Sequence, residues 1–250
     1  MIRLRYFIAL LAMSLSTAYG ENITFKSRKW DSANQKVLTE EVTEDCIAIE
    51  GQNDEWQGLG EKGKTYYYVV SGTVKRKTLN CFGEVHIVLC DGASLTCTGG
   101  IKLERHNAAQ IHIHTQSDGD AMGCLKVTNS YKETAGIGSA EDVSCGDVFI
   151  HGGKLDVTGG KYGAGIGTGP LYDREGSVGG EVRVYAGDVT VHGGDKAAGI
   201  GSGSAWVTSQ NDAGELYVYG GIVRATGGDM GAGVGGGGGR DRTFIRSSKM

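Results

Sequence analysis

Proline is almost missing from this chain, which has one proline and 44 glycines among its 250 residues. The glycines follow no three-residue period, so a collagen triple helix is excluded. The net charge is −4, and the basic footprint of a nucleic-acid-binding protein is therefore absent. The six cysteines include no Cys-x-x-Cys pair, which disfavours a zinc site.

Long apolar runs are missing as well. The N-terminal run, Tyr6–Leu15, is well short of the ~20 residues that span a membrane. It follows Arg3 and Arg5 and precedes Ala18-Tyr19-Gly20, a pattern typical of a secretory signal. We therefore expect residues 1–20 to be a signal peptide, and the mature chain to be secreted, extracellular or on the cell surface, with no transmembrane segment. In an exported chain the six cysteines suggest disulfides, whose pairing the sequence cannot choose.

What the chain does contain is a repeat. Residues 146–160, 180–194 and 214–228 read GDVFIHGGKLDVTGG, GEVRVYAGDVTVHGG and GELYVYGGIVRATGG, with starts 34 residues apart. Two segments of each copy alternate apolar and polar residues, as half-buried strands do. A third, small-residue segment ends at Ile166, Ile200 or Val234. A period in this range indicates a solenoid, a propeller or an array.

The pattern predicts an all-β fold, a parallel β-helix with three short faces per 34-residue coil and glycine at the corners. A propeller blade needs four strands and a leucine-rich repeat needs more leucine, so both are weaker readings. We expect a small N-terminal β cap over 21–65, with Ile23–Trp30 and Lys36–Val42 paired as a hairpin. The β-helix is expected over 66–239, with degenerate early coils, and a tail over 240–250.

The segments GGKYGAGIGTG, GGDKAAGIGSG and GGDMGAGVGGG follow the three copies. They resemble the GAGIGGG…GGxVxATGG repeats of secreted and surface glycine-rich proteins of gut-type bacteria, which are related to carbohydrate-binding parallel β-helix proteins. The resemblance covers roughly residues 40–239. It implies an adhesive or glycan-facing protein, and it carries no catalytic motif.

Outward positions of the first strand form two columns of rings. One runs through His112, Phe149, Arg183 and Tyr217, and the next through His114, His151, Tyr185 and Tyr219. Flat rings bury the apolar faces of sugars, so we predict ligand contacts from Tyr185, Tyr219, Tyr217, Phe149, His151 and His114. The alternative is ordinary cross-strand stacking. Tyr172 and Trp206, 34 residues apart in successive loops, are a second candidate pair, unless they fold back over the flank.

Asp147, Glu181 and Glu215 occupy equivalent positions and are weak candidates for calcium, although solvated carboxylates are the simpler reading. No other cofactor is indicated. We expect a binding protein that contacts carbohydrate or a host or matrix surface, with no nucleic-acid partner. A polysaccharide lyase or glycoside hydrolase, or a purely structural spacer, are the alternatives. A further partner prediction is association through an uncapped C-terminal end or through a glycine-rich face, which contains Gly136, Gly165, Gly199 and Gly233.

Overall fold

A computed structural model describes residues 20–52, 55–172, 176–206 and 212–238 of the chain. The expected signal peptide, except Gly20, and the tail over 240–250 lie outside these residues. The described part is all-β and has only two 3-10 turns, η1 (Arg105–Asn107) and η2 (Gly119–Ala121). No helix in it is long and apolar enough to cross a membrane.

Within the described residues, nineteen strands form two sheets. They are β1 (Glu21–Asp31), β2 (Lys36–Ala48), β3 (Trp56–Val70), β4 (Thr73–Arg76), β5 (Thr78–Leu89), β6 (Ser94–Cys97), β7 (Ile101–Leu103), β8 (Gln110–Thr115), β9 (Cys124–Thr128), β10 (Ile137–Gly138), β11 (Asp147–Ile150), β12 (Lys154–Thr158), β13 (Ile166–Gly167), β14 (Glu181–Val184), β15 (Asp188–His192), β16 (Ile200–Gly201), β17 (Glu215–Val218), β18 (Ile222–Thr226) and β19 (Val234–Gly235).

Within the repeats, residues 34 apart are hydrogen-bonded neighbours. Val148 pairs with Val182, which pairs with Leu216, and Val157 pairs in the same way with Val191. All these pairs are parallel, so each side chain lies over its equivalent in the next strand. Alternation places Val182, Val184, Val189 and Val191 inside, where all four are buried. The alignment of the copies read from the sequence therefore matches the strand register.

The regular parallel β-helix expected from the repeat is wrong. The larger sheet has 13 strands and is mixed, because β1 pairs antiparallel with both β2 and β8. Strands β1, β2, β3, β5 and β8 are joined in a closed five-stranded barrel by the additional pairing of β8 with β5. A separate six-stranded parallel sheet contains β4, β6, β9, β12, β15 and β18. The departure arises from the first 90 residues, where β1, β2, β3 and β5 have 11 to 15 residues, whereas the strands of the repeats have two to five.

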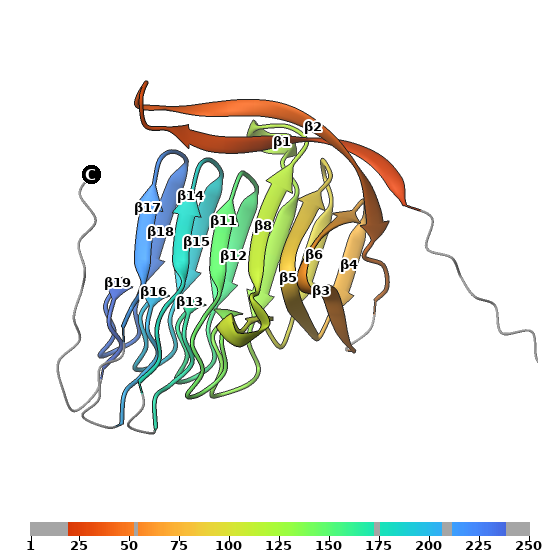
Figure 1. The fold of residues 1–250 in the computed structure, drawn as a ribbon. Coiled ribbons are helices and arrows are strands. Elements are labelled where there is room, and N and C mark those ends of the chain that lie inside the picture. The colour runs from red at the N-terminus through yellow and green to blue at the C-terminus, as the bar shows by residue number, and fades with distance from the viewer. Residues whose placement is uncertain (1–19, 53–54, 173–175, 207–211, 239–250) are drawn as a thin grey trace, which may run out of the picture.

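The predicted N-terminal hairpin is present, with Phe25 opposite Val42 in an antiparallel register. Its position differs from that of a cap over one end. It lies across the ends of β8, β11, β14 and β17, along the whole row of strands (Figure 1). Strand β2 continues beyond the predicted hairpin segment, and its end pairs in parallel with β3 at Ile47 and Ala48.

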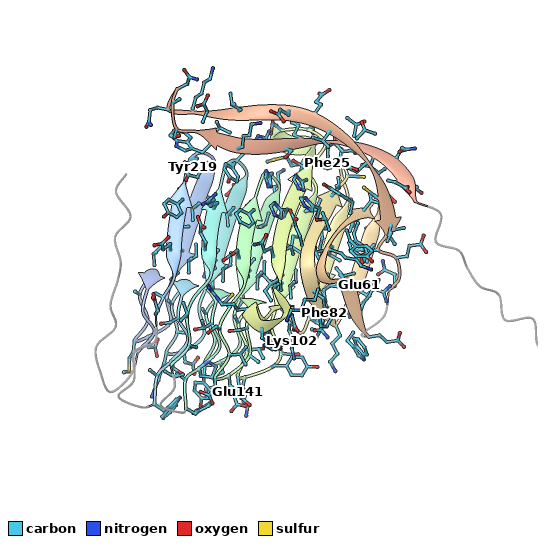
Figure 2. All side chains as sticks on the ribbon, viewed as in Figure 1. Phe25, Glu61, Phe82, Lys102, Glu141 and Tyr219 are labelled. Atoms are coloured by element: carbon cyan, nitrogen blue, oxygen red, sulfur yellow. The ribbon has the colours of Figure 1, made fainter. Side chains whose placement is uncertain are left out.

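One apolar core runs through the stacked strands, and a smaller one lies under the hairpin. The smaller core consists of Phe25, Cys46, Val69 and Val88. Tyr219 lies below the hairpin at the far end of the same row (Figure 2). All six cysteines are free thiols in the structure, so none of the suggested disulfides is formed.

The glycines of the third, small-residue segments pack against neighbouring atoms and do not form an open face. Gly136, Gly165 and Gly199 are buried, and a Cβ on Gly165 would lie 2.3 Å from Val191 Cγ1. These positions need glycine because backbone and core side chains approach closely there. The last strands β17, β18 and β19 form the sheet ends, where Val218, Ile222 and Val234 are exposed.

The inward register can be tested with two aspartates placed side by side on β15. Val191→Asp should cost several kcal/mol, because it leaves an unpaired charge in the core. Thr190→Asp points outward and should cost about 1 kcal/mol or less. Urea unfolding of both variants would measure this, and equal losses would mean that the register is shifted by one residue.

The packed glycines yield a second test. Gly165→Ala should destabilise the fold by about 1–3 kcal/mol through overpacking against Val191. Gly72→Ala is the matched control, since a Cβ there would meet nothing within 4 Å. Thermal unfolding should show a lower midpoint for Gly165→Ala alone. A similar midpoint for both variants would contradict the close packing.

Candidate functional site

The outer face of β8, β11, β14 and β17 carries three parallel columns of side chains. The carboxylate column contains Asp147, Glu181 and Glu215. The central column contains His112, Phe149, Arg183 and Tyr217. The covered column contains His114, His151, Tyr185 and Tyr219. The strand pairing fixes these columns, because equivalent residues of parallel strands stack at ~4.8 Å.

The covered column lies beneath β1. The rings of Phe25 and His114 are 4.6 Å apart, and Trp30 stacks on Tyr219 at 4.7 Å. Between them the Arg28 backbone N–H donates to His151 Nδ1 at 2.9 Å. His114, His151 and Tyr185 are buried as a result, and Tyr219 is half-buried. Of the six ring residues predicted on this face, these four are therefore in contact with or enclosed by the protein itself.

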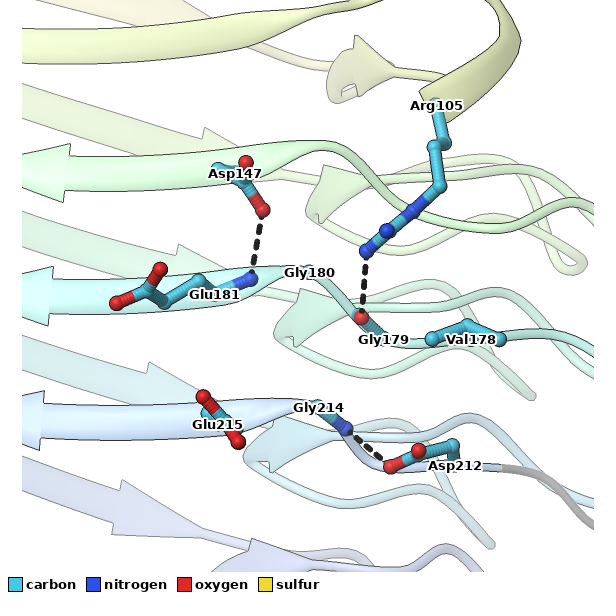
Figure 3. A pocket seen from close by; sticks show the side chains of 9 residues that line it. All are labelled: Arg105, Asp147, Val178, Gly179, Gly180, Glu181, Asp212, Gly214 and Glu215. Atoms are coloured by element: carbon cyan, nitrogen blue, oxygen red, sulfur yellow. Dashed lines mark hydrogen bonds between the residues drawn. The ribbon is translucent and has the colours of Figure 1, made fainter. Parts of the chain in front are cut away.

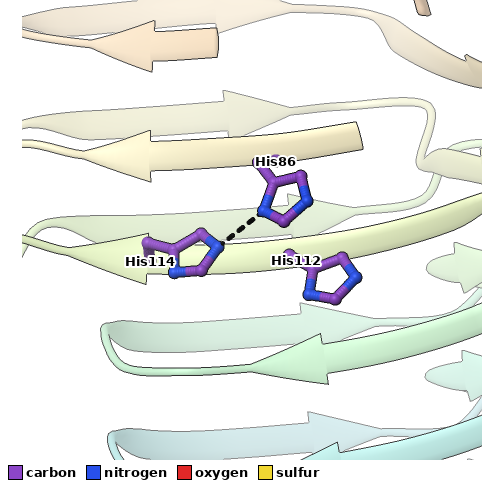
Figure 4. Close-up of side chains that lie close together, drawn as sticks. All are labelled: His86, His112 and His114. Atoms are coloured by element: carbon purple, nitrogen blue, oxygen red, sulfur yellow. Dashed lines mark hydrogen bonds between the residues drawn. The ribbon is translucent and has the colours of Figure 1, made fainter. Parts of the chain in front are cut away.

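Four imidazoles from β5, β8 and the end of β11 form a network at the start of these columns. His86 Nδ1 lies 2.9 Å from His114 Nε2 (Figure 4). His112 Nδ1 lies 3.1 Å from His151 Nε2. His114 Nδ1 lies 3.2 Å from the Lys26 carbonyl oxygen, so it must carry a proton and donate. The sequence placed His112, His114 and His151 in columns but did not single out His86, and it did not predict the hydrogen bonds that cross from one column to the other.

The partners assign the neutral tautomers. Because His114 donates from Nδ1, its Nε2 accepts, and His86 must donate from Nδ1. Because His151 Nδ1 accepts from Arg28, its Nε2 donates to His112. The remaining nitrogen of His86, Nε2, lies 3.1 Å from Glu84 Oε1, and because Nδ1 already carries the proton of the neutral ring, Nε2 donates to this carboxylate only when His86 is protonated.

Burial disfavours the charged form of all four imidazoles. It lowers the pKa of His112 and of His151 to about 2, and the neighbouring imidazoles add to the effect. Burial also lowers the pKa of His114 well below its usual range. For His86, burial lowers the pKa while the hydrogen bond to Glu84 opposes the shift.

His86, His112 and His114 are the one group of three or more potential ligands within common reach of an ion among the described residues, with donor atoms inside 4.8 Å. Their rings are nearly parallel, at 12° between His86 and His112 and 7° between His112 and His114. In-plane lone pairs of parallel rings do not converge on one point, and three of the six nitrogens already have imidazole partners. The arrangement fits a hydrogen-bonded network better than a metal centre.

The central column remains open to solvent in part. The Arg183 guanidinium lies between two rings, 5.7 Å from the Phe149 centroid and 5.6 Å from that of Tyr217. Its Nε also donates to Glu181 Oε1. Phe149, Arg183 and Tyr217 are all half-buried, so part of each side chain is open to solvent outside the hairpin.

The carboxylate column borders a cavity of about 290 Å³ (Figure 3). Arg105, donating to the Gly179 carbonyl at 3.1 Å, closes one side of it. Each carboxylate has a donor of its own: Glu181 N–H reaches Asp147 at 2.8 Å, and Tyr217 O–H reaches Glu215 at 2.9 Å. Calcium at Asp147, Glu181 and Glu215 remains a prediction, and these hydrogen bonds already offset part of the repulsion that motivated it.

The second predicted pair, Tyr172 and Trp206, does come together. Their rings stack at 6.3 Å, Tyr162 meets Trp206 edge-on at 5.8 Å, and Lys196 Nζ lies 4.9 Å from the Trp206 centroid. Trp206 is still 46% exposed. Tyr172 donates to Glu133 at 3.2 Å; burial first, then this carboxylate, raises the pKa of Tyr172 to about 12. The pair forms a separate cluster in the loops and does not join the columns.

Comparison with protein-family models, with curated proteins and with solved structures finds no match for this chain.

Proposed function

We propose that this chain is a secreted or cell-surface protein that binds carbohydrate through the open part of the outer face. The observation that carries the proposal is the sandwich of Arg183 between Phe149 and Tyr217. Each ring lies one repeat away from Arg183. The guanidinium covers one face of each ring and His112 stacks on the other face of Phe149 at 4.4 Å, so the column offers the edge of Phe149 and, on the last strand of the sheet, the outer side of Tyr217. Next to it lie the carboxylate column and the cavity.

The chemistry of this surface suits a sugar chain. Aromatic faces bury the apolar C–H face of a pyranose, and planar polar groups fix the hydroxyls around it. Glu181 and Glu215 supply acceptors, and Arg183 supplies donors, all held in place by hydrogen bonds to neighbours. Held groups lose little entropy on binding, which favours affinity for an extended ligand lying across β11, β14 and β17.

The proposed location rests on the N-terminal pattern of Arg3, Arg5 and the apolar run Tyr6–Leu15. The resemblance to secreted glycine-rich repeat proteins supports the same setting and the same ligand class. The alternative of a lyase or hydrolase is also carried by this face, since carboxylates line its cavity.

Removing the two rings tests the binding face. Phe149→Ala and Tyr217→Ala together should weaken glycan binding by about 1–3 kcal/mol, because two apolar contacts are lost. Both side chains are half-buried on the outer surface, so the fold should survive. The measurement is a glycan array to find the ligand, followed by calorimetry on the wild-type chain and the double variant.

Thr190→Ala is the control, because Thr190 points outward from β15 on the other sheet. Its affinity should equal that of the wild type. Unchanged affinity in the double variant would remove this face from the proposal and direct attention to Tyr172 and Trp206. Release of new reducing ends from a bound polysaccharide would favour the hydrolase alternative instead.

A further inference from the structure

We propose that the β1–β2 hairpin is an acid-released cover of the column His114, His151, Tyr185 and Tyr219, and that its release widens the binding face. The widening of the binding face rests on the proposed function, whereas the release of the hairpin does not. The cover and the column are matched in length. From Phe25 to Trp30, β1 advances about 16 Å at ~3.3 Å per residue, while three strand steps from His114 to Tyr219 cover about 14 Å.

The hairpin is attached to the stack mainly through side chains. In the described structure, its backbone pairs with the stack at one position, Lys26 opposite Thr115. Its other contacts are made through side chains: Phe25 and Trp30 stack on the column, Arg28 bonds to His151, and Lys26 and Arg28 pair with Asp118. His114 and Gln116 donate to backbone carbonyls of β1, and Phe25 also packs in the smaller core with Val69 and Val88. At its base, β2 stays paired with β3 through Ile47 and Ala48. The hairpin can therefore lift from the column while it remains tethered.

Protonation breaks the attachment at a defined atom. His151 Nδ1 accepts from the Arg28 N–H, and a protonated imidazole has no lone pair with which to accept. The new charge would also lie against the Arg28 guanidinium, which donates to the His151 carbonyl. Protonation of His114 likewise removes the acceptor that His86 Nδ1 uses.

The charges around the network do not offset this. Asp118 is the acidic group nearest to Arg28 and Lys26, and it already pairs with both at 2.6 Å. Glu84 and Glu44 raise the pKa of His86 and so oppose the effect of its burial. The groups that face the imidazoles are Lys26 and Arg28 from β1, Asp118 from the loop after β8, Glu44 from β2, Tyr67 from β3, Glu84 from β5 and Tyr185 after β14.

The direction of the pH effect follows from the closed state. There, burial holds the pKa of His151 at about 2 and that of His114 well below its usual range. In water an imidazole titrates near ~6.5. The open form therefore binds protons more readily, so the cover is held above pH ~6.5 and is progressively released as the pH falls below it.

Hydrogen exchange at the Arg28 amide tests the movement in the full chain. If His114 and His151 both take up a proton on opening, its opening constant should rise about 100-fold per pH unit below pH ~6. Amides of β14 and β15 should stay protected over the same range. Loss of protection in β1 and β14 at the same pH, or a β1 protection factor that does not depend on pH, would overturn the proposal.

His151→Gln isolates the proton that breaks the bond. The glutamine carbonyl can still accept from Arg28 but does not titrate. The opening constant of the Arg28 amide should therefore rise only about tenfold per pH unit, and this dependence is the slope that is compared below. His192→Gln, at an exposed position on β15, is the matched control and should keep the wild-type slope. An unchanged slope in His151→Gln would exclude His151 as the trigger. The slope is used because it does not depend on how much either substitution changes overall stability.

Glycan binding at pH 7 and pH 5 separates the two proposals. Tighter binding at pH 5 in the wild type, together with opening of β1, supports both the cover and its role at the binding face. Opening of β1 without glycan binding at either pH would refute the proposed function, but it would still support the acid release of the hairpin. Opening with equal binding at both pH values would refute the claim that release widens the site.

Discussion

Parallel hydrogen bonding between residues 34 apart is the constraint on which the rest of the structure depends. It holds each side chain directly over its equivalent, so the sequence of one repeat becomes a set of columns. Inside, the columns are branched apolar residues and make the core. Outside, the same rule stacks rings, imidazoles and carboxylates that an isolated strand would leave apart. The surface chemistry of the face is therefore as periodic as its backbone.

Columns have a cost when their members are charged, because like groups one strand apart repel. The chain moderates this cost locally. Arg183 takes the place of a ring between Phe149 and Tyr217 and pairs with Glu181, and Tyr217 pairs with Glu215. The imidazoles avoid this repulsion because burial disfavours their charged forms, and they bond to one another across columns. In both cases a neighbour along or beside the column bonds to most of these groups; the exception is His112 Nε2, which has no hydrogen-bond partner and lies 3.5 Å from Glu84 Oε1.

The strand register, the inward residues and the N-terminal hairpin could all be predicted, because each depends on contacts within one repeat period or one turn. The barrel and the docking of the hairpin could not. His114 and Phe25 are 89 residues apart and touch through rings alone, and no repeat relates them. Sequence alternation also treats Tyr217 and Tyr219 alike, since both point outward. The hairpin, which follows no 34-residue period, makes the difference between a covered column and an open one.

The covered column explains why a polar network occupies a place where apolar side chains would pack more simply. A hairpin held by apolar contacts alone would bind the stack equally well at every pH, and its position along the row would be set only by shape. The bonds from Arg28 to His151 and from His114 to Lys26 join defined atoms. They therefore fix where β1 lies along the column. They also make the attachment depend on a neutral imidazole. The parallel strand pairing that lines up four histidines for these bonds thus also couples the hairpin to proton concentration.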